Sequence, residues 1–124
     1  MIWIAIGAGG ALGAMARHGV NHLLQGRFPA FPAGIFLVNA AGCLAIGLFA
    51  GLLASTRMHM GEHGRTFVVV GLLGGFTTFS SYGLDTLTLA RAGHTGLALA
   101  NALGQMVVGL AAVWLGFSAG SWRP

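Results

Sequence analysis

The 124-residue sequence contains no lysine and only two acidic residues, Glu62 and Asp85, beside six arginines. Charged residues make up 6% of the chain, whereas about a quarter of a soluble domain is usually charged. Hydrophobic residues make up 56%, which is more apolar surface than a soluble domain of this length could bury. These shortages exclude an ordinary soluble protein and predict an integral membrane protein that sits in a lipid bilayer.

Further absences exclude several kinds of chemistry. Cys43 is the single cysteine, so no disulfide can form within the chain, and we expect it to be a small packing residue. No nucleophile is accompanied by a base and an acid, so an enzyme is not predicted. The five histidines lie near segment ends without carboxylate support, which does not predict a metal site. The N-terminus has no basic stretch typical of a cleavable signal, so the first segment is expected to remain.

Four apolar segments are each about long enough to cross a bilayer, which takes roughly 20 residues. We therefore expect an all-α protein with one transmembrane domain over residues 1–124 and helices at roughly 1–24, 32–54, 65–90 and 95–120. The first segment qualifies only if Arg17 is tolerated inside it. Small residues spaced four apart allow helix backbones to approach closely in lipid. The glycine pairs with this spacing are Gly9 and Gly13, Gly47 and Gly51, Gly71 and Gly75, and Gly116 and Gly120.

The arginines are scattered rather than clustered on one face, so nucleic acid is not an expected partner. In a four-span chain, both termini and the loop between the second and third segments share one side. The arginines of that side are Arg57, Arg65 and Arg123, and those of the other side are Arg27 and Arg91, together with Arg17 if it reaches the interface. This near-balance gives no clear orientation under the positive-inside rule. Insertion in both orientations, with two copies paired antiparallel, and a single orientation set by subtler features both remain open.

The third segment carries the most informative polar residues. Residues 74–82 read Gly-Gly-Phe-Thr-Thr-Phe-Ser-Ser-Tyr and place four hydroxyls beside paired glycines within an apolar helix. Backbone groups freed by a helix break cannot face hydrocarbon, so such a break is expected to line a wet path or to be buried in protein. A broken helix offers carbonyls to a cation and amides to an anion. The aromatic residues of this stretch either form core packing or offer positive ring edges to an anion.

Other polar residues leave two interpretations open. Asn39 in the second segment either bonds to a neighbouring helix or donates from its amide into a pore. Asn101 and Gln105 share a helix face and either join helices or line the same polar path. Arg17 either extends to the interface or raises the anion concentration at a vestibule. Asp85 either pairs with an arginine or caps a helix.

The motif at residues 74–82 resembles the Gly-Gly-x-Thr-Thr-Phe-Ser-Thr-Phe signature of the CrcB/Fluc fluoride ion channels. Residues 32–42, Pro-Ala-Gly-Ile-Phe-Leu-Val-Asn-Ala-Ala-Gly, resemble that family's second-helix motif, and residues 9–17 are similar to its first-helix motif. The length and the four apolar segments also agree, so the resemblance covers nearly the whole chain.

The resemblance implies an antiparallel, dual-topology homodimer in the bacterial cytoplasmic (inner) membrane, with several spans per chain and two fluoride pores. The residues implied to line each pore are Asn39, Phe79, Ser80, Ser81, Tyr82, Thr78 and the vestibule residue Arg17. The backbone carbonyls of Gly74 and Thr77 are implied to hold a structural sodium ion at the dimer interface. Asp85 stands where the family typically has glutamate.

The expected function is passive, fluoride-selective export that lowers the fluoride concentration in the cytoplasm. Tyr82 replaces the usual phenylalanine, and its hydroxyl needs a partner or will itself reach into the path. A proton-coupled small multidrug exporter is the alternative, but it needs a carboxylate in the first helix, and residues 1–24 contain none. A structural subunit would account for the glycines but not for the hydroxyls of the third segment.

Overall fold

The computed structural model describes residues 1–122, and these residues form helices and contain no strand. Arg123, which was expected to lie on the side shared by both termini, is outside the described residues. The elements in chain order are α1 (Ile2–Gln25), α2 (Ala33–Ala54), α3 (Glu62–Thr66), the π-helical segment η1 (Phe67–Leu73), α4 (Gly74–Phe76), α5 (Phe79–Arg91) and α6 (Thr95–Ser121). The all-α expectation is therefore confirmed for the described chain.

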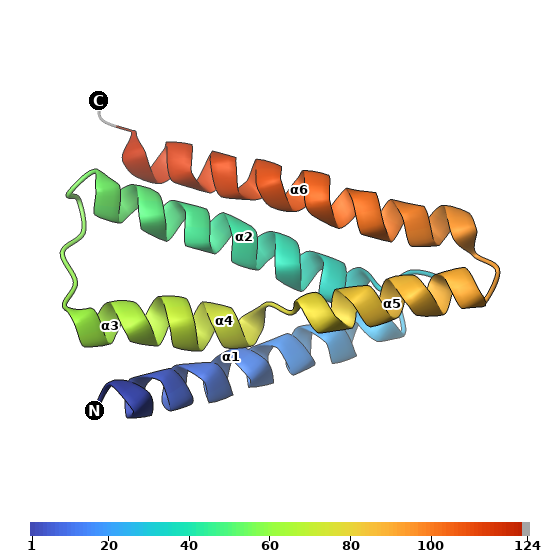
Figure 1. The fold of residues 1–124 in the computed structure, drawn as a ribbon, viewed down its shortest axis with the longest axis horizontal. Helices are drawn as coiled ribbons and strands as arrows, with labels where there is room; N and C mark the ends of the chain where they lie inside the picture. Colours follow the sequence, from blue (N-terminus) through green and yellow to red (C-terminus); the bar gives the residue numbers. More distant parts are fainter. Residues whose placement is uncertain (123–124) are drawn as a thin grey trace.

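The helices form two pairs that run side by side (Figure 1). α2 packs along α6, and α1 packs along η1 and α4. α5 leaves the α1 pair and packs against α6 instead. The third helical stretch thus begins in one pair and ends in the other, and α2 contacts both of its halves.

Glycine is required where the paired helices touch. A Cβ atom added to Gly75 would lie 2.5 Å from the carbonyl oxygen of Gly10, and one added to Gly9 would lie 2.5 Å from that of Phe67. On the other pair, a Cβ atom on Gly120 would lie 2.8 Å from the backbone nitrogen of Leu52. All four glycine pairs picked out by their spacing lie at such contacts, as expected for small residues at helix interfaces in lipid.

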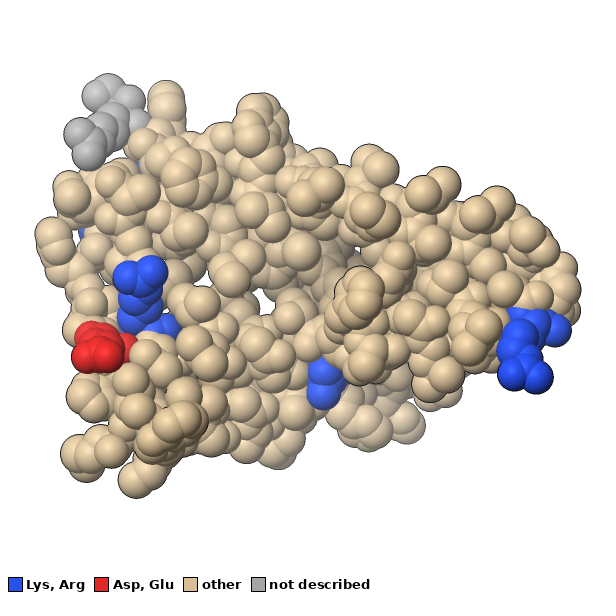
Figure 2. Space-filling model, in the orientation of Figure 1, with Lys and Arg blue, Asp and Glu red and all other residues tan. Residues whose placement is uncertain are grey.

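Three helical stretches are long and apolar enough to cross a membrane: Ala33–Ala54, Glu62–Arg91 and Thr95–Ser121. α1 is not among them, which differs from the expectation of four spans. The reason is that Arg17 and His18 lie inside the 24 residues of α1 and lower its mean hydropathy. Figure 2 shows charged side chains mainly toward the two ends of the molecule, with one basic group near the middle.

Candidate functional site

The third helical stretch is interrupted at two residues. α4 ends at Phe76, Thr77 and Thr78 both have extended backbone, and α5 begins at Phe79. Thr77 still belongs partly to the preceding helix, because its backbone N–H and its hydroxyl both donate to the Leu73 carbonyl, at 3.0 Å. At the break, the third helical stretch changes its packing partner from α1 to α6, and α2 contacts it on both sides of the break.

Asn39 of α2 binds the extended backbone at two points. Its Oδ1 accepts from the Thr78 N–H at 2.9 Å, and its Nδ2 donates to the Thr78 carbonyl at 3.0 Å. Its second Nδ2 hydrogen donates to Gln105 Oε1 at 2.7 Å. An amide NH₂ has two hydrogens, so both Asn39 donors are already engaged. The residue predicted to donate into a pore therefore also stabilises the helix break.

The break leaves backbone carbonyls, among them those of Gly74 and Thr77, without their usual helical donors. In an α-helix, each carbonyl accepts from the N–H four residues later. The Thr78 N–H, the helical partner of the Gly74 carbonyl, donates to Asn39 instead, and the Ser81 N–H donates to Thr78 Oγ1 rather than to the Thr77 carbonyl. Arg17 Nη1 donates to the Thr77 carbonyl at 3.2 Å, so the guanidinium reaches the break.

The hydroxyls at the start of α5 form a small cluster. Thr78 is the N-cap of α5, and its Oγ1 accepts from the Ser81 N–H at 3.2 Å. The same Oγ1 lies 3.1 Å from Ser80 Oγ and 3.3 Å from Ser81 Oγ. Unpaired N–H groups and the helix dipole make a helix N-terminus favourable to anions. The cluster and the α5 N-terminus together give this side of the break an anion-favouring character.

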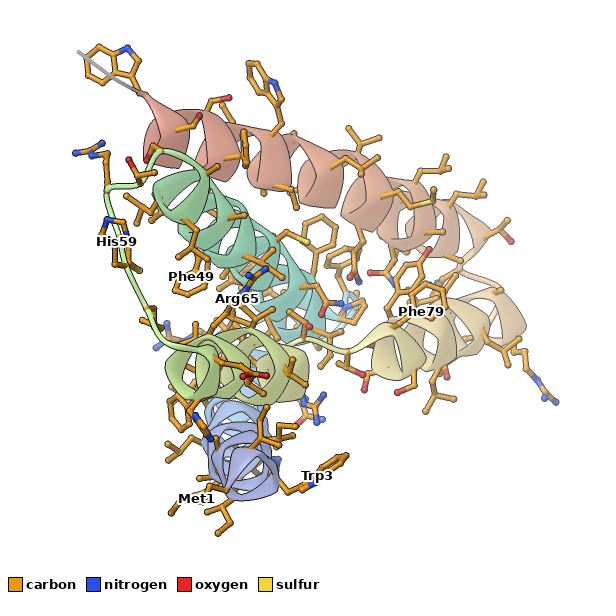
Figure 3. The ribbon with its side chains drawn as sticks, turned by 60° about the vertical axis from the view of Figure 1, so that its left-hand side comes forward. Met1, Trp3, Phe49, His59, Arg65 and Phe79 are labelled. Carbon is orange, nitrogen blue, oxygen red and sulfur yellow. The ribbon has the colours of Figure 1, made fainter. Side chains whose placement is uncertain are left out.

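Two aromatic rings follow the break. Phe79 is 84% exposed in the single chain, and its ring centroid lies 5.3 Å from that of Tyr82. Figure 3 labels Phe79 at the start of α5. The Tyr82 hydroxyl donates to the Ala102 carbonyl of α6 at 3.1 Å. This hydroxyl therefore has a partner on α6, which answers the question raised by the replacement of the family's usual phenylalanine.

A cavity of ≈ 410 Å³ lies beside the break. Its lining includes six of the nine predicted site residues, namely Asn39, Gly74, Thr77, Thr78, Phe79 and Tyr82. The other three adjoin these six through the hydrogen bonds given above: Arg17 to Thr77, and Ser80 and Ser81 to Thr78.

Gln105 also lines this cavity. The sequence had left two roles open for it, joining helices or lining a polar path. Its spacing of four from Asn101 was the available signal, since both amides fall on one face of α6. The sequence could not identify Asn39 as the group that Gln105 contacts, because the two residues lie on different helices.

Asp85 lies away from this cavity. It lines a second cavity of ≈ 350 Å³ formed with Asn21, Gln25 and the connection between α1 and α2. Its Oδ2 is buried and has no hydrogen-bond partner within residues 1–122. Asp85 therefore neither pairs through Oδ2 with an arginine of that range nor joins the predicted pore residues. Over the same residues, no group of three or more His, Cys, Asp or Glu side chains could hold a metal ion.

Comparison with known proteins identifies relatives of the chain. Residues 4–117 match the family described as "CrcB-like protein, Camphor Resistance (CrcB)". The chain is 50% identical over 119 residues to a "Fluoride-specific ion channel FluC" of Paracoccus denitrificans, covering 95% of this chain and 93% of that one. It is 46% identical to a protein of the same name from Opitutus terrae, over 93% and 89% of the two chains, and 44% identical to one from Methylobacillus flagellatus, over 90% and 88%.

Proposed function

The chain belongs to the CrcB family, and we propose that it is a fluoride-selective ion channel that lets fluoride leave the cell passively. The observation that carries this proposal is the channel name of relatives up to 50% identical over nearly the full length. The chain is a channel and not an enzyme. Passive export would lower the cytoplasmic fluoride concentration. The alternative of a proton-coupled exporter is not favoured, because α1 contains no carboxylate.

The groups beside the helix break suit a small, strongly hydrated anion. Removing water from such an ion is costly unless other donors replace it. The hydroxyls of Thr78, Ser80 and Ser81 and the N-terminus of α5 are such donors. The rings of Phe79 and Tyr82 add positive edges. Fluoride would then pass along the cavity beside the break, from one donor to the next.

Arg17 supplies the positive charge of this route. Its guanidinium is partly buried and donates to the carbonyl of Thr77, the residue before the hydroxyl cluster. A fixed positive charge near a narrow path raises the local concentration of anions. We assign Arg17 to attracting fluoride towards the break.

The functional unit we propose is an antiparallel, dual-topology homodimer that crosses the bacterial inner membrane several times. Its support is that a single chain leaves Ser80, Gly74 and the Phe79 ring exposed. A hydroxyl or a freed carbonyl that faces hydrocarbon has no partner there. A second copy packed against this side would cover these groups at mid-membrane depth. The nearly balanced arginines permit both orientations of the chain.

A structural sodium ion between the two copies is the cofactor we propose. The Gly74 carbonyl, whose helical donor is taken by Asn39, is the fitting ligand, and the Thr77 carbonyl keeps one lone pair beside Arg17. A sodium ion needs several oxygen ligands, so both copies would have to contribute. Bound there, the ion would hold two helix breaks together. If fluoride flux and dimer stability were both indifferent to replacing sodium with N-methylglucammonium, this site would be wrong.

The test of the channel is fluoride efflux from liposomes. Purified protein is reconstituted into vesicles loaded with potassium fluoride, and release is followed with a fluoride electrode after valinomycin is added. Matched vesicles loaded with chloride are the control. We expect fast fluoride release and no chloride release beyond that of protein-free vesicles. Fluoride release at the protein-free rate, or equal release of both anions, would contradict the assignment.

A further inference from the structure

A chain of side-chain hydrogen bonds runs from the helix break to the interior of α6. Asn39 Nδ2 donates to Gln105 Oε1 at 2.7 Å, and Gln105 Nε2 donates to Asn101 Oδ1 at 3.0 Å. Asn101 Nδ2 then donates to Thr86 Oγ1 at 2.8 Å, and the Thr86 hydroxyl donates to the Tyr82 carbonyl at 2.8 Å. The chain therefore joins α2, α6 and α5 through four consecutive side chains, which we call the amide relay.

The direction of every bond in the amide relay is set by backbone atoms. The oxygen and nitrogen of a side-chain amide are usually assigned from their surroundings. At Asn39 the surroundings are a backbone N–H and a backbone carbonyl of Thr78, so the atom facing Gln105 must be the nitrogen. Gln105 must then present its oxygen to Asn39 and its nitrogen to Asn101. Reversing any one amide would put two acceptors or two donors face to face.

Burial makes the far end of the amide relay rigid. Asn101 is fully buried, and its two bonded neighbours fix both ends of its amide. Gln105 is half-buried and lines the cavity beside the break. Its oxygen accepts the one Asn39 hydrogen that is not committed to Thr78. That oxygen occupies the position in which an anion would accept from Asn39.

We infer that Gln105 is a positioning residue for Asn39 and that an anion must displace its oxygen to reach the Asn39 amide. This inference rests on the proposed passage of fluoride along this cavity. An anion that displaces Gln105 Oε1 exchanges one acceptor for another, so the amide hydrogen is never left without a partner. Asn101 and Thr86 hold Gln105 in place, and they therefore set how hard it is to displace.

The substitution that tests the inference is Gln105→Met, which keeps the length of the side chain and removes its oxygen. Without a competitor, the concentration of fluoride at half-maximal efflux is expected to fall about fivefold, equivalent to about 1 kcal/mol. Thr86→Val removes the hydroxyl at the far end of the amide relay and should lower this half-maximal concentration by a smaller factor, about twofold. Gln25→Met makes the same exchange at the exposed end of α1 and should leave the half-maximal fluoride concentration unchanged.

A second readout does not depend on transport. Side-chain amide signals of ¹⁵N-labelled protein in lipid nanodiscs are followed by NMR while potassium fluoride or potassium chloride is added. Fluoride should shift the Asn39 and Gln105 signals together, and in Gln105→Met the Asn39 signal should shift at lower fluoride concentration. An unchanged half-maximal concentration at wild-type rate in Gln105→Met would reduce Gln105 to a contact between helices. An increase would mean that Gln105 binds the anion itself, which also overturns the inference.

The two readouts separate this inference from the proposed function. If vesicles release fluoride but fluoride does not shift the two amide signals, the displacement of Gln105 is wrong and the channel function is supported. If the signals respond to fluoride while wild-type vesicles release none, the displacement stands and the channel is wrong. If Gln105→Met does not yield folded protein, the Thr86→Val shift decides, because that variant retains Gln105 and removes only a distant support. A half-maximal fluoride concentration in Thr86→Val equal to that of the wild type would then contradict the inference.

Discussion

Replacing Asn39 with aspartate is the sharpest test of the helix break. Aspartate has the same shape, and one of its oxygens can still accept from the Thr78 N–H. The other oxygen would face the Thr78 carbonyl and Gln105 Oε1, which stand 3.0 Å and 2.7 Å from the present Nδ2. Two hydrogen bonds are thereby replaced by two contacts between acceptors. A negative charge is also placed beside the proposed anion path.

The structure sets the size of the effect. Leaving a buried acceptor without a donor costs about 1–3 kcal/mol, so the two lost bonds amount to about 2–6 kcal/mol. Only about 1.4 kcal/mol of added barrier lowers a rate tenfold. The aspartate charge repels an anion on the adjoining path, so Asn39→Asp should reduce fluoride efflux at least about tenfold. It should also lower the thermal stability of the protein, because Thr78 loses one of its two anchors to α2.

The measurement is the initial rate of fluoride efflux from liposomes at equal reconstituted protein, with thermal unfolding followed in detergent. Gln25→Glu is the matched control, because it makes the same amide-to-carboxylate exchange at an exposed position of α1. The control should stay within about twofold of the wild-type rate, a barrier change of about 0.4 kcal/mol. Asn39→Asp with wild-type efflux and wild-type stability would refute the reasoning, since neither the anchor nor the charge would then matter.

Three further changes have defined outcomes. Phe79→Ile keeps an apolar side chain but removes the ring edge, so efflux should fall at least about tenfold. Equal efflux would exclude the ring from the path. Tyr82→Phe should retain efflux and lower stability by about 1 kcal/mol, since its hydroxyl donates to α6; a strong loss of flux would assign the hydroxyl to the path. Gly75→Ala should destabilise the protein in thermal unfolding, because its Cβ would lie 2.5 Å from a backbone oxygen of α1, whereas Gly83→Ala, with nothing within 4 Å, should be tolerated.

The helical architecture follows from short-range properties of the sequence. Apolar length predicted the helical segments, and the spacing of four between Gly71 and Gly75 predicted a close helix contact, which the structure shows to be with α1. The first segment was expected to span only if Arg17 is tolerated, and α1, which contains Arg17 and His18, is not among the three stretches apolar enough to cross a membrane. The π-helical turns of η1 were not predicted, because a shift from four- to five-residue hydrogen bonding has no distinct apolar pattern.

The residues of the site were accessible from the sequence, but their partners were not. Hydroxyls beside paired glycines indicated where the third helix would be polar. Whether Asn39 would point its donors at a neighbouring helix or at a pore depends on side-chain torsions and on what α6 presents opposite it. The structure directs both donors to protein groups, Thr78 and Gln105, so the contact with neighbouring helices is observed and donation into a pore stays a prediction.

The Arg17 charge and the extended backbone of the helix break meet at the Thr77 carbonyl. The Thr77 carbonyl loses its helical donor because the Ser81 N–H caps α5 through Thr78 instead. The Arg17 guanidinium donates to this carbonyl in place of the Ser81 N–H. The positive charge thus has a polar partner at the end of α4, where it would otherwise need water. Because the freed carbonyl satisfies the arginine and the arginine satisfies the carbonyl, neither could be removed alone without cost. The arginine that we propose to attract the anion is thus also the donor that satisfies a carbonyl at the helix break.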